Sequence, residues 1–381
     1  MSIEFVLKKY DWVDALRGYA IILVIMIHTS QFFTVTGVLR RITSLGDLGV
    51  QLFFILSSFT LFNSYKKRAD IDGANTDKFF FIRRFFRIAP MYYLALVIYV
   101  SISIIRPGSF VGEAVNYIKV LASFLFLNTF YPPGINYLPP GGWSIGVEMI
   151  FYLIIPFLCK QVRNLKQSLL TLLGAVILSN LLNLILYSYI NNYTDVNWSV
   201  IRGGFLYFWL PNQFPVFMFG VVIYYLLKKI DISKAFSNIL VVISFLLFFS
   251  FSLYDFSLAY PQYFVQREYI YSIIFLIFIL GVSGSNIKVL INKYICNLGK
   301  VSFSVYLLHF LVIRIVYRLF VFLPGDNMAN SKFLIGFVSS IAASYALSLM
   351  THKYVELRGI KFGNRIIGRI RSSDKLLISK I

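Results

Sequence analysis

Apolar stretches of about twenty residues recur along the whole chain, separated by short polar segments. A helix needs about 20 residues to cross the hydrocarbon core of a bilayer, so each stretch predicts one membrane-spanning helix. The pattern predicts ten spans, at residues 13–34, 46–64, 85–105, 143–159, 167–189, 205–227, 236–254, 268–286, 301–323 and 332–354. We therefore expect an all-α membrane protein with about ten transmembrane helices.

The stretch between the third and fourth spans does not fit this pattern. Its apolar run, at 120–130, is too short to cross, and a Pro/Gly-rich piece follows at 131–142. Such a run is typical of a short re-entrant or interfacial segment, which we place near 117–142. The polar groups of irregular backbone at membrane depth must form hydrogen bonds with protein or with water in a cavity. The segment is therefore either an external loop or a re-entrant wall of a site.

Composition and charge support the membrane prediction. The chain is 58% hydrophobic and has a mean hydropathy of +0.75, which is too apolar for a soluble domain of 381 residues. The net charge of +20 comes from Lys and Arg clustered between the spans, which indicates contact with the lipid bilayer rather than with nucleic acid. Most of these residues, Lys8 and Lys9 among them, face the cytoplasm if both termini do, as the positive-inside rule favours. Three histidines and two cysteines predict no metal site.

Two ionisable residues in the first span, Arg17 and His28, form the first candidate site. They are eleven residues apart, which is three helical turns plus about 20°, so they share one helix face. They lie roughly 16 Å apart along the axis. Charged groups inside a span are costly and usually mark a functional site.

Further polar residues lie in the later spans. Glu148, four residues after Ser144, either caps the start of the fourth span or lines a polar cavity with His28. His309 in the ninth span either bonds to a neighbouring helix or belongs to the site. His352 and Glu356, four apart at the end of the last span, are expected to form a structural pair near the surface.

Two basic segments are predicted on the cytoplasmic side. Arg83, Arg84 and Arg87 lie among aromatic residues. They serve either as a membrane anchor or as a surface for polyphosphate, because one guanidinium group can donate two parallel hydrogen bonds to a phosphate. The basic tail at 358–381 is expected to be a cytoplasmic anchor on the membrane surface.

Several motifs together resemble acyltransferase family 3, whose signature is an arginine followed by ten residues and a histidine. The matches are D11-W-V-D-A-L-R-G-Y-A-I-I-L-V-I-M-I-H28, V50-Q-L-F-F-I-L-S-S-F59, R83-R-F-F-R-I-A-P90, G141-G-W-S-I-G-V-E148, Y306-L-L-H309 and Y354-V-E356. One departure is Ser57–Ser58, where the family often has Ser-Gly. The resemblance spans residues 1–357, which we take as one transmembrane domain.

The resemblance implies an integral membrane O-acyltransferase of the bacterial inner membrane. Such enzymes move an acyl group, usually acetyl from acetyl-CoA, onto hydroxyls of a cell-surface glycan such as O-antigen lipopolysaccharide. Acetyl-CoA would be a substrate rather than a resident cofactor, and the acceptor would be a glycan or a lipid-linked glycan. The resemblance assigns catalysis to Arg17, His28 and Glu148 and donor binding to Arg83, Arg84 and Arg87. It assigns the acceptor or cavity wall to Gly141, Gly142, Trp143, Ser144 and His309.

The chemistry of these residue types agrees with that assignment. His28 can act as a base for the acceptor hydroxyl or as a nucleophile that carries the acyl group. Arg17 can bind CoA phosphate or polarise the thioester carbonyl. Two routes stay open: an acyl-histidine relay, or a through-membrane cavity in which His28 acts as a base.

Two other classes share the multi-pass pattern. A polysaccharide transporter or polymerase would use intramembrane charges to gate a glycan path. An ion-coupled carrier would use Arg17 and His28 as a proton relay.

Overall fold

The computed structural model describes residues 10–110, 114–193, 202–252, 267–285, 287–320 and 329–378. Within these ranges every regular element is a helix, and no strand occurs. The predicted all-α fold is confirmed. Residues 1–9, which include Lys8 and Lys9, and residues 379–381 of the predicted tail lie outside the described residues.

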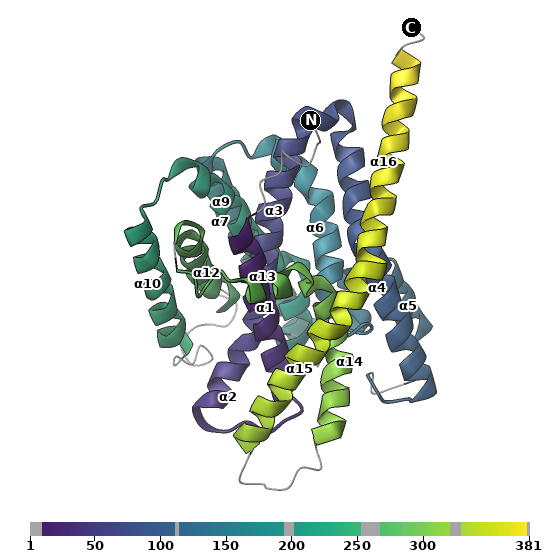
Figure 1. Cartoon of the computed structure of the whole chain (residues 1–381), viewed down its shortest axis with the longest axis vertical. Helices are drawn as coiled ribbons and strands as arrows, with labels where there is room; N and C mark the ends of the chain where they lie inside the picture. Colours follow the sequence, from purple (N-terminus) through teal and green to yellow (C-terminus); the bar gives the residue numbers. More distant parts are fainter. Residues whose placement is uncertain are drawn as a thin grey trace.

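Ten long helices in the described part of the chain form the body of the molecule (Figure 1). They are α1 (Asp11–Ser30), α3 (Gly49–Asp72), α4 (Thr76–Ile105), α6 (Gly142–Gln161), α7 (Leu165–Tyr193), α9 (Leu210–Lys229), α10 (Lys234–Ser252), α12 (Arg267–Gly284), α14 (Ser302–Phe320) and α15 (Ala329–Thr351). Each coincides with one predicted span. By length and hydropathy, 9 continuous helical segments of the described chain can cross a membrane, and one of these, Gly37–Ile105, contains both α3 and α4.

Shorter elements connect the long helices. They are α2 (Gly37–Ser44), α5 (Tyr117–Phe124), α13 (Lys293–Lys300), the 3-10 turns η2 (Leu45–Leu48), η3 (Gly73–Asn75), η4 (Asn128–Phe130) and η5 (Pro132–Gly134), and the π-helical turns η6 (Arg202–Leu206) and η8 (His352–Glu356).

Burial separates central helices from peripheral ones. In the apolar windows of α7 and α10 only 17% of the residues are buried, against 67% in α6 and in the segment that contains α9. The exposed residues of α7 and α10 are large and apolar, such as Ile185 and Leu246. An apolar outer surface is expected where helices face hydrocarbon, because lipid tails are as apolar as leucine.

Glycines bring the central backbones together. A β-carbon on Gly299 of α13 would overlap the backbone carbonyl oxygen of Asp14 in α1, and one on Gly220 of α9 would overlap that of Ile55 in α3. Small residues at helix crossings allow such close approach in membranes. These contacts fix α1 and α3 at the centre of the molecule.

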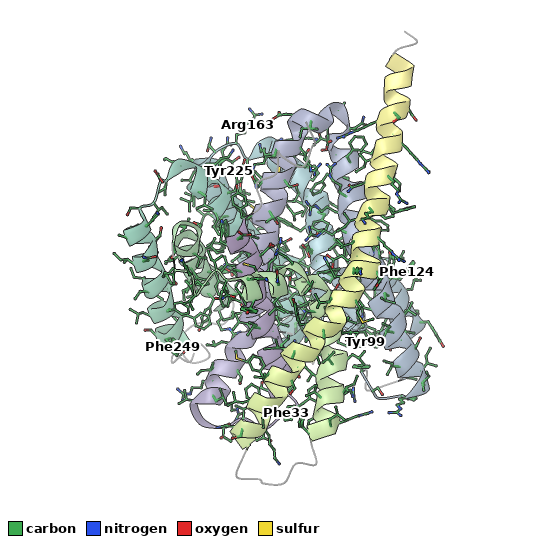
Figure 2. The ribbon with its side chains drawn as sticks, viewed as in Figure 1. Phe33, Tyr99, Phe124, Arg163, Tyr225 and Phe249 are labelled. Atoms are coloured by element: carbon green, nitrogen blue, oxygen red, sulfur yellow. The ribbon has the colours of Figure 1, made fainter. Side chains whose placement is uncertain are left out.

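The segment near 117–142 forms α5 and then folds back onto the helices. Phe124 of α5 lies at the edge of the molecule (Figure 2), while Asn128 is buried and donates from Nδ2 to the carbonyl oxygen of Ile135 at 3.0 Å. The segment ends at Gly141, whose carbonyl oxygen accepts a hydrogen bond from Tyr306 of α14 at 3.1 Å. It therefore forms a buried wall against α14 as well as an exposed helix.

The predicted tail continues the last span instead of leaving it. α15 passes through η8 into α16 (Leu357–Ile378), and α16 runs alongside α4 (Figure 1). Gly363 of α16 packs against Phe86, and Arg371 bonds to the buried carboxylate of Asp72. The tail is thus docked on the helices that carry the basic cluster, while its contact with a membrane surface stays a prediction.

Candidate functional site

A basic cavity of about 450 Å³ lies where the start of α1, the second half of α3, the first half of α4 and α16 meet. Its lining includes Arg17, Lys67, Arg68, Arg83, Arg84, Arg87 and, from α16, Ile360 and Asn364. Asp14 is the one acidic residue in that lining. A concave surface with this excess of positive charge favours a polyanion.

A smaller central cavity of about 90 Å³ lies deeper between the helices. Its polar lining comprises Arg17, Ser57, Thr60, Arg84, Arg87, Ser144, Glu148, Tyr152, Lys300, Ser302, Tyr306 and Glu356. Arg17, Thr60, Arg84 and Arg87 line both cavities, so these four side chains form a shared wall. The arrangement places a basic surface next to a polar interior.

Arg17 is held at the boundary between the cavities. Its Nη2 donates to Oγ1 of Thr60 at 3.1 Å, and its Nη1 lies 3.9 Å from the carboxylate of Asp14. Most of its side chain is buried, at 20% exposure. A guanidinium fixed this way can place positive charge beside a reacting carbonyl at no further ordering cost.

Glu148 faces the central cavity from α6. Its Oε1 accepts hydrogen bonds from Ser57 of α3 and, at 2.8 Å, from the hydroxyl of Tyr152. Because α6 begins at Gly142 and Glu148 lies beyond its first turn, Glu148 does not cap the helix. Glu148 instead lines a polar cavity, which was the other possibility from the sequence. It shares that cavity with Arg17, and His28 is not among the lining residues.

The three arginines of α4 have different surroundings. Arg83 pairs with Asp72 at 2.6 Å, and Arg371 of α16 occupies the other oxygen of the same carboxylate. Arg84 lies over the ring of Phe80 and reaches the central cavity, as does Arg87. Arg83 therefore links α4 to α16, while Arg84 and Arg87 face both cavities.

Tyr306 of α14 closes the far side of the central cavity. Its hydroxyl accepts from Oγ of Ser144 at 2.9 Å and donates to the carbonyl oxygen of Gly141 at 3.1 Å. Gly141 has φ 77°, a left-handed conformation that favours glycine, and a β-carbon there would lie 3.1 Å from this hydroxyl oxygen. Gly141, Ser144 and Tyr306 thus form one hydrogen-bonded unit.

His28 lies beyond Tyr306, against α14. Its ring centroid is 4.2 Å from that of Phe310 and 5.2 Å from that of His309, which in turn is 5.6 Å from the ring of Tyr306. Nδ1 of His28 bonds to Oε1 of Gln31 at 3.1 Å. A proton on Nδ1 in this bond would leave Nε2 as the free base.

His309 is completely buried beside His28. Its Nδ1 donates to the carbonyl oxygen of Tyr306 at 2.5 Å, a bond within its own helix rather than to the neighbouring helix that the sequence suggested. Its Nε2 has no hydrogen-bond partner among the described residues. The two histidines therefore form a pair on the side of Tyr306 away from Arg17.

Glu356 does not lie near the surface, as the sequence had suggested. It pairs with His352 at 2.9 Å as predicted, but it is 2% exposed and lines the central cavity instead of lying near the surface. The π-helical turn η8 inserts extra backbone at this point and turns Glu356 inward, where Ser304 also donates to it at 3.1 Å. Such turns are frequent at functional sites.

The remaining predicted positions support the site from outside. Trp143 is buried, and its ring packs against Phe54 and Phe208 with centroids 5.9 and 4.8 Å away. A β-carbon on Gly142 would lie 3.1 Å from the ring of Pro139. Neither residue lines the central cavity.

The sequence prediction missed several lining residues. Ser57, Thr60 and Tyr152 face Arg17 and Glu148, and Tyr306 and Glu356 close the central cavity. Ser57 and Thr60 are polar residues three apart in an apolar span, and this spacing could have indicated a polar helix face. No group of three potential metal ligands occurs in the described ranges.

Comparison with known proteins gives a family. A model described as an acyltransferase domain matches residues 10–349. The peptidoglycan O-acetyltransferase OatA of Listeria monocytogenes is 31% identical over 197 residues, which are 47% of this chain and 30% of that protein. No solved structure matches the chain.

Two further relatives match over more of the chain. A Staphylococcus aureus (strain COL) protein named as a candidate O-acetyltransferase is 24% identical over 329 residues, 81% of this chain and 51% of its own length. A protein of Acidianus two-tailed virus, named as a candidate acetyltransferase, is 25% identical over 310 residues, 80% of this chain and 84% of its own length. The chain thus spans about half of the staphylococcal protein and less of the Listeria protein.

Proposed function

The chain belongs to acyltransferase family 3, and from that membership we propose that it moves an acetyl group from acetyl-CoA onto a hydroxyl of a cell-surface glycan, such as O-antigen lipopolysaccharide. The observation that carries the proposal is the pair of contiguous cavities with Arg17, Arg84 and Arg87 in their shared wall. A donor with several phosphates and a long thioester arm suits a basic entrance that leads to a narrow polar interior.

The donor is assigned to the basic cavity. Lys67, Arg68, Arg84 and Arg87 supply charge for its phosphates, and Arg17 stands where the arm would enter the central cavity. There the guanidinium of Arg17 would stabilise the negative charge that develops on the thioester oxygen. Placing this entrance in the cytoplasm agrees with the positive-inside prediction of both termini inside a bacterial inner membrane.

His28 is assigned to the acyl acceptor step. In direct transfer, the hydroxyl oxygen bonds to the acyl carbon, the C–S bond breaks, and the hydroxyl proton passes to Nε2 of His28 and then to the CoA thiolate. In a relay, Nε2 first bonds to the acyl carbon as the C–S bond breaks and CoA leaves as the thiolate. The hydroxyl oxygen then bonds to the acyl carbon as the C–N bond breaks, and the hydroxyl proton passes to the CoA thiolate. Either route requires passage past Tyr306, since His28 does not line the central cavity.

An adduct test separates the two routes. Purified protein is treated with acetyl-CoA without acceptor, quenched in acid and analysed by peptide mass spectrometry. Acetyl on His28 that chases into added glycan supports the relay. Transfer that proceeds at full rate with no such adduct supports His28 as a base.

A strain test addresses the function itself. Mass spectrometry of surface glycans is compared between strains that carry the wild type, the His28→Ala variant or no protein. We expect full-length glycan in all three, with an ester only in the wild type. Altered chain length or lost export would instead indicate a transporter or polymerase.

A further inference from the structure

A second groove lies at the end of the bundle away from the basic cavity, between the end of α4 and the last turns of α14. Its lining comprises Ile102, Ile105, Arg106, Ser109, Phe110, Leu311, Arg314, Ile315 and Arg318, around about 250 Å³. The lining combines apolar side chains with three arginines, Arg106, Arg314 and Arg318, which we call the rim. It shares no residue with the two cavities of the proposed active site.

Three arginines give this rim a charge that the described chain does not balance. No carboxylate of the described residues forms an ion pair with Arg106, Arg314 or Arg318. Arg314 lies 5.0 Å over the ring of Phe110, which holds its guanidinium at the groove. Arg314 and Arg318 are four apart on one helix, where like charges repel, so an anion between them would relieve the repulsion.

The apolar part of the lining is suited to a hydrocarbon chain. Ile105 is 76% exposed and Ile315 is 51% exposed, and both lie in the groove beside the arginines. An apolar groove that is open to the side and ends in guanidinium groups fits a molecule with a chain at one end and a phosphate at the other.

The groove is connected to the histidine pair through Tyr99. The hydroxyl of Tyr99 donates to the carbonyl oxygen of Leu307 and accepts from the backbone N–H of Leu311, each at 3.1 Å. In a regular helix the N–H of Leu311 would bond to the carbonyl oxygen of Leu307, and the Tyr99 hydroxyl bridges these two groups instead, one on each side of His309. Figure 2 shows Tyr99 where α4 meets α14. Its ring also packs on Phe110 with the centroids 4.7 Å apart.

Arg314 lies near the depth of the histidine pair but on another face of α14. It follows His309 by five residues, which is about 7.5 Å of helix rise and about 140° of rotation around the helix axis. A glycan attached to a phosphate at Arg314 would therefore pass around α14 to reach His28 and His309.

We propose that this groove binds the lipid phosphate that carries the acceptor glycan, with Arg106, Arg314 and Arg318 on the phosphate and the lipid chain along Ile102, Ile105 and Ile315. The proposal rests on the proposed function for the identity of the headgroup. It assigns the acceptor side of the reaction to the face of α14 opposite the donor cavities.

The test measures lipid retention without any acyl donor. Purified full-length protein in detergent is titrated with a long-chain polyprenyl phosphate or with phosphatidylglycerol, and the bound lipid is counted by native mass spectrometry. We expect the wild type to retain the polyprenyl phosphate preferentially. The Arg314→Gln/Arg318→Gln variant should lose about tenfold in affinity, as expected when charge-assisted bonds are removed.

Two further variants make the result specific. Arg40→Gln/Arg41→Gln removes two exposed arginines of α2 and should retain the lipid like the wild type. Ile105→Trp narrows the groove at an exposed position and should weaken binding even if the double arginine variant does not fold. Equal retention of both lipids by the wild type, or unchanged retention by both groove variants, would overturn the proposal.

Acetyl transfer is measured separately on the same wild-type preparation. Active protein without lipid preference would refute the groove and leave the enzyme assignment intact. Selective lipid binding by an inactive protein would support the groove and refute the enzyme assignment.

Discussion

Ser57 on α3 donates a hydrogen bond to the carboxylate of Glu148 on α6, across the wall of the central cavity. The bond fixes Glu148 beside Arg17 and Arg84 in the lining. A carboxylate held in this way is available to accept a proton or to orient a cationic group.

Removal of this carboxylate should impair catalysis more than stability. We expect Glu148→Gln to lower kcat for acetyl transfer by about 100-fold or more, the range seen for positioned acid–base groups, because an amide cannot accept a proton. Ser57→Ala should have a smaller effect, since Tyr152 still donates to Glu148. Steady-state kinetics with acetyl-CoA provide the measurement, and a fully active Glu148→Gln variant would exclude Glu148 from the chemistry.

Arg84 and Arg87 should determine affinity for the donor. Substitution of either by alanine should raise KM for acetyl-CoA about tenfold, because each loss removes one charge-assisted contact to phosphate. Arg163→Ala is the matched control, since this exposed arginine lies at the same end of the molecule and lines neither cavity (Figure 2). A KM unchanged in all three variants would place the donor elsewhere.

Asp72 should act by docking α16. The Asp72→Asn variant leaves Arg83 and Arg371 without their carboxylate, so we expect the free energy of unfolding to fall by about 2–3 kcal/mol. Because Ile360 and Asn364 of α16 line the basic cavity, KM for acetyl-CoA should rise as well. Thermal unfolding in detergent gives the first quantity.

The control for Asp72 is an exposed ion pair between the start of α4 and the end of α6. Lys160→Gln removes the pair with Asp77, whose partners are 60% and 43% exposed, and should cost less than about 1 kcal/mol. Equal loss of stability in both variants would mean that α16 is not held by Asp72.

Tyr306 and Gly141 should change activity together. Tyr306→Phe removes the bonds to Ser144 and Gly141, and Gly141→Ala forces a β-carbon against the same hydroxyl at a strained φ. We expect each to lower kcat by about tenfold, with the double variant close to either single one because one unit is disrupted. Strictly additive losses would show that the two residues act independently.

Gly299 should be intolerant of any side chain. A β-carbon there overlaps the backbone of Asp14, so Gly299→Ala should destabilise the protein by about 3 kcal/mol or more as α13 separates from α1. Gly174→Ala in α7, where no atom lies within 4 Å of the added carbon, should be neutral or slightly stabilising. Thermal unfolding of the two variants compares them directly.

The local features could be predicted from the sequence because they depend on neighbours along the chain. Hydrophobic runs determined the helices, and the spacing of Arg17 and His28 determined that α1 presents both on one face. The family motifs pointed to Glu148 and to the arginines of α4. The roles of these residues in catalysis stay predictions.

Contacts between helices were decided only by the tertiary structure. Periodicity says which face of a helix is polar, but ten apolar helices offer many equivalent neighbours. Only the packing of α14 against α1 places His309 beside His28, and only the turn η8 brings Glu356 into the central cavity. Asp72, far from Arg371 in sequence, pairs with both Arg371 and Arg83. The sequence by itself therefore determined the helices and their charged faces, while long-range packing decided which faces meet, because close approach depends on matched small residues and buried ion pairs that no local pattern records.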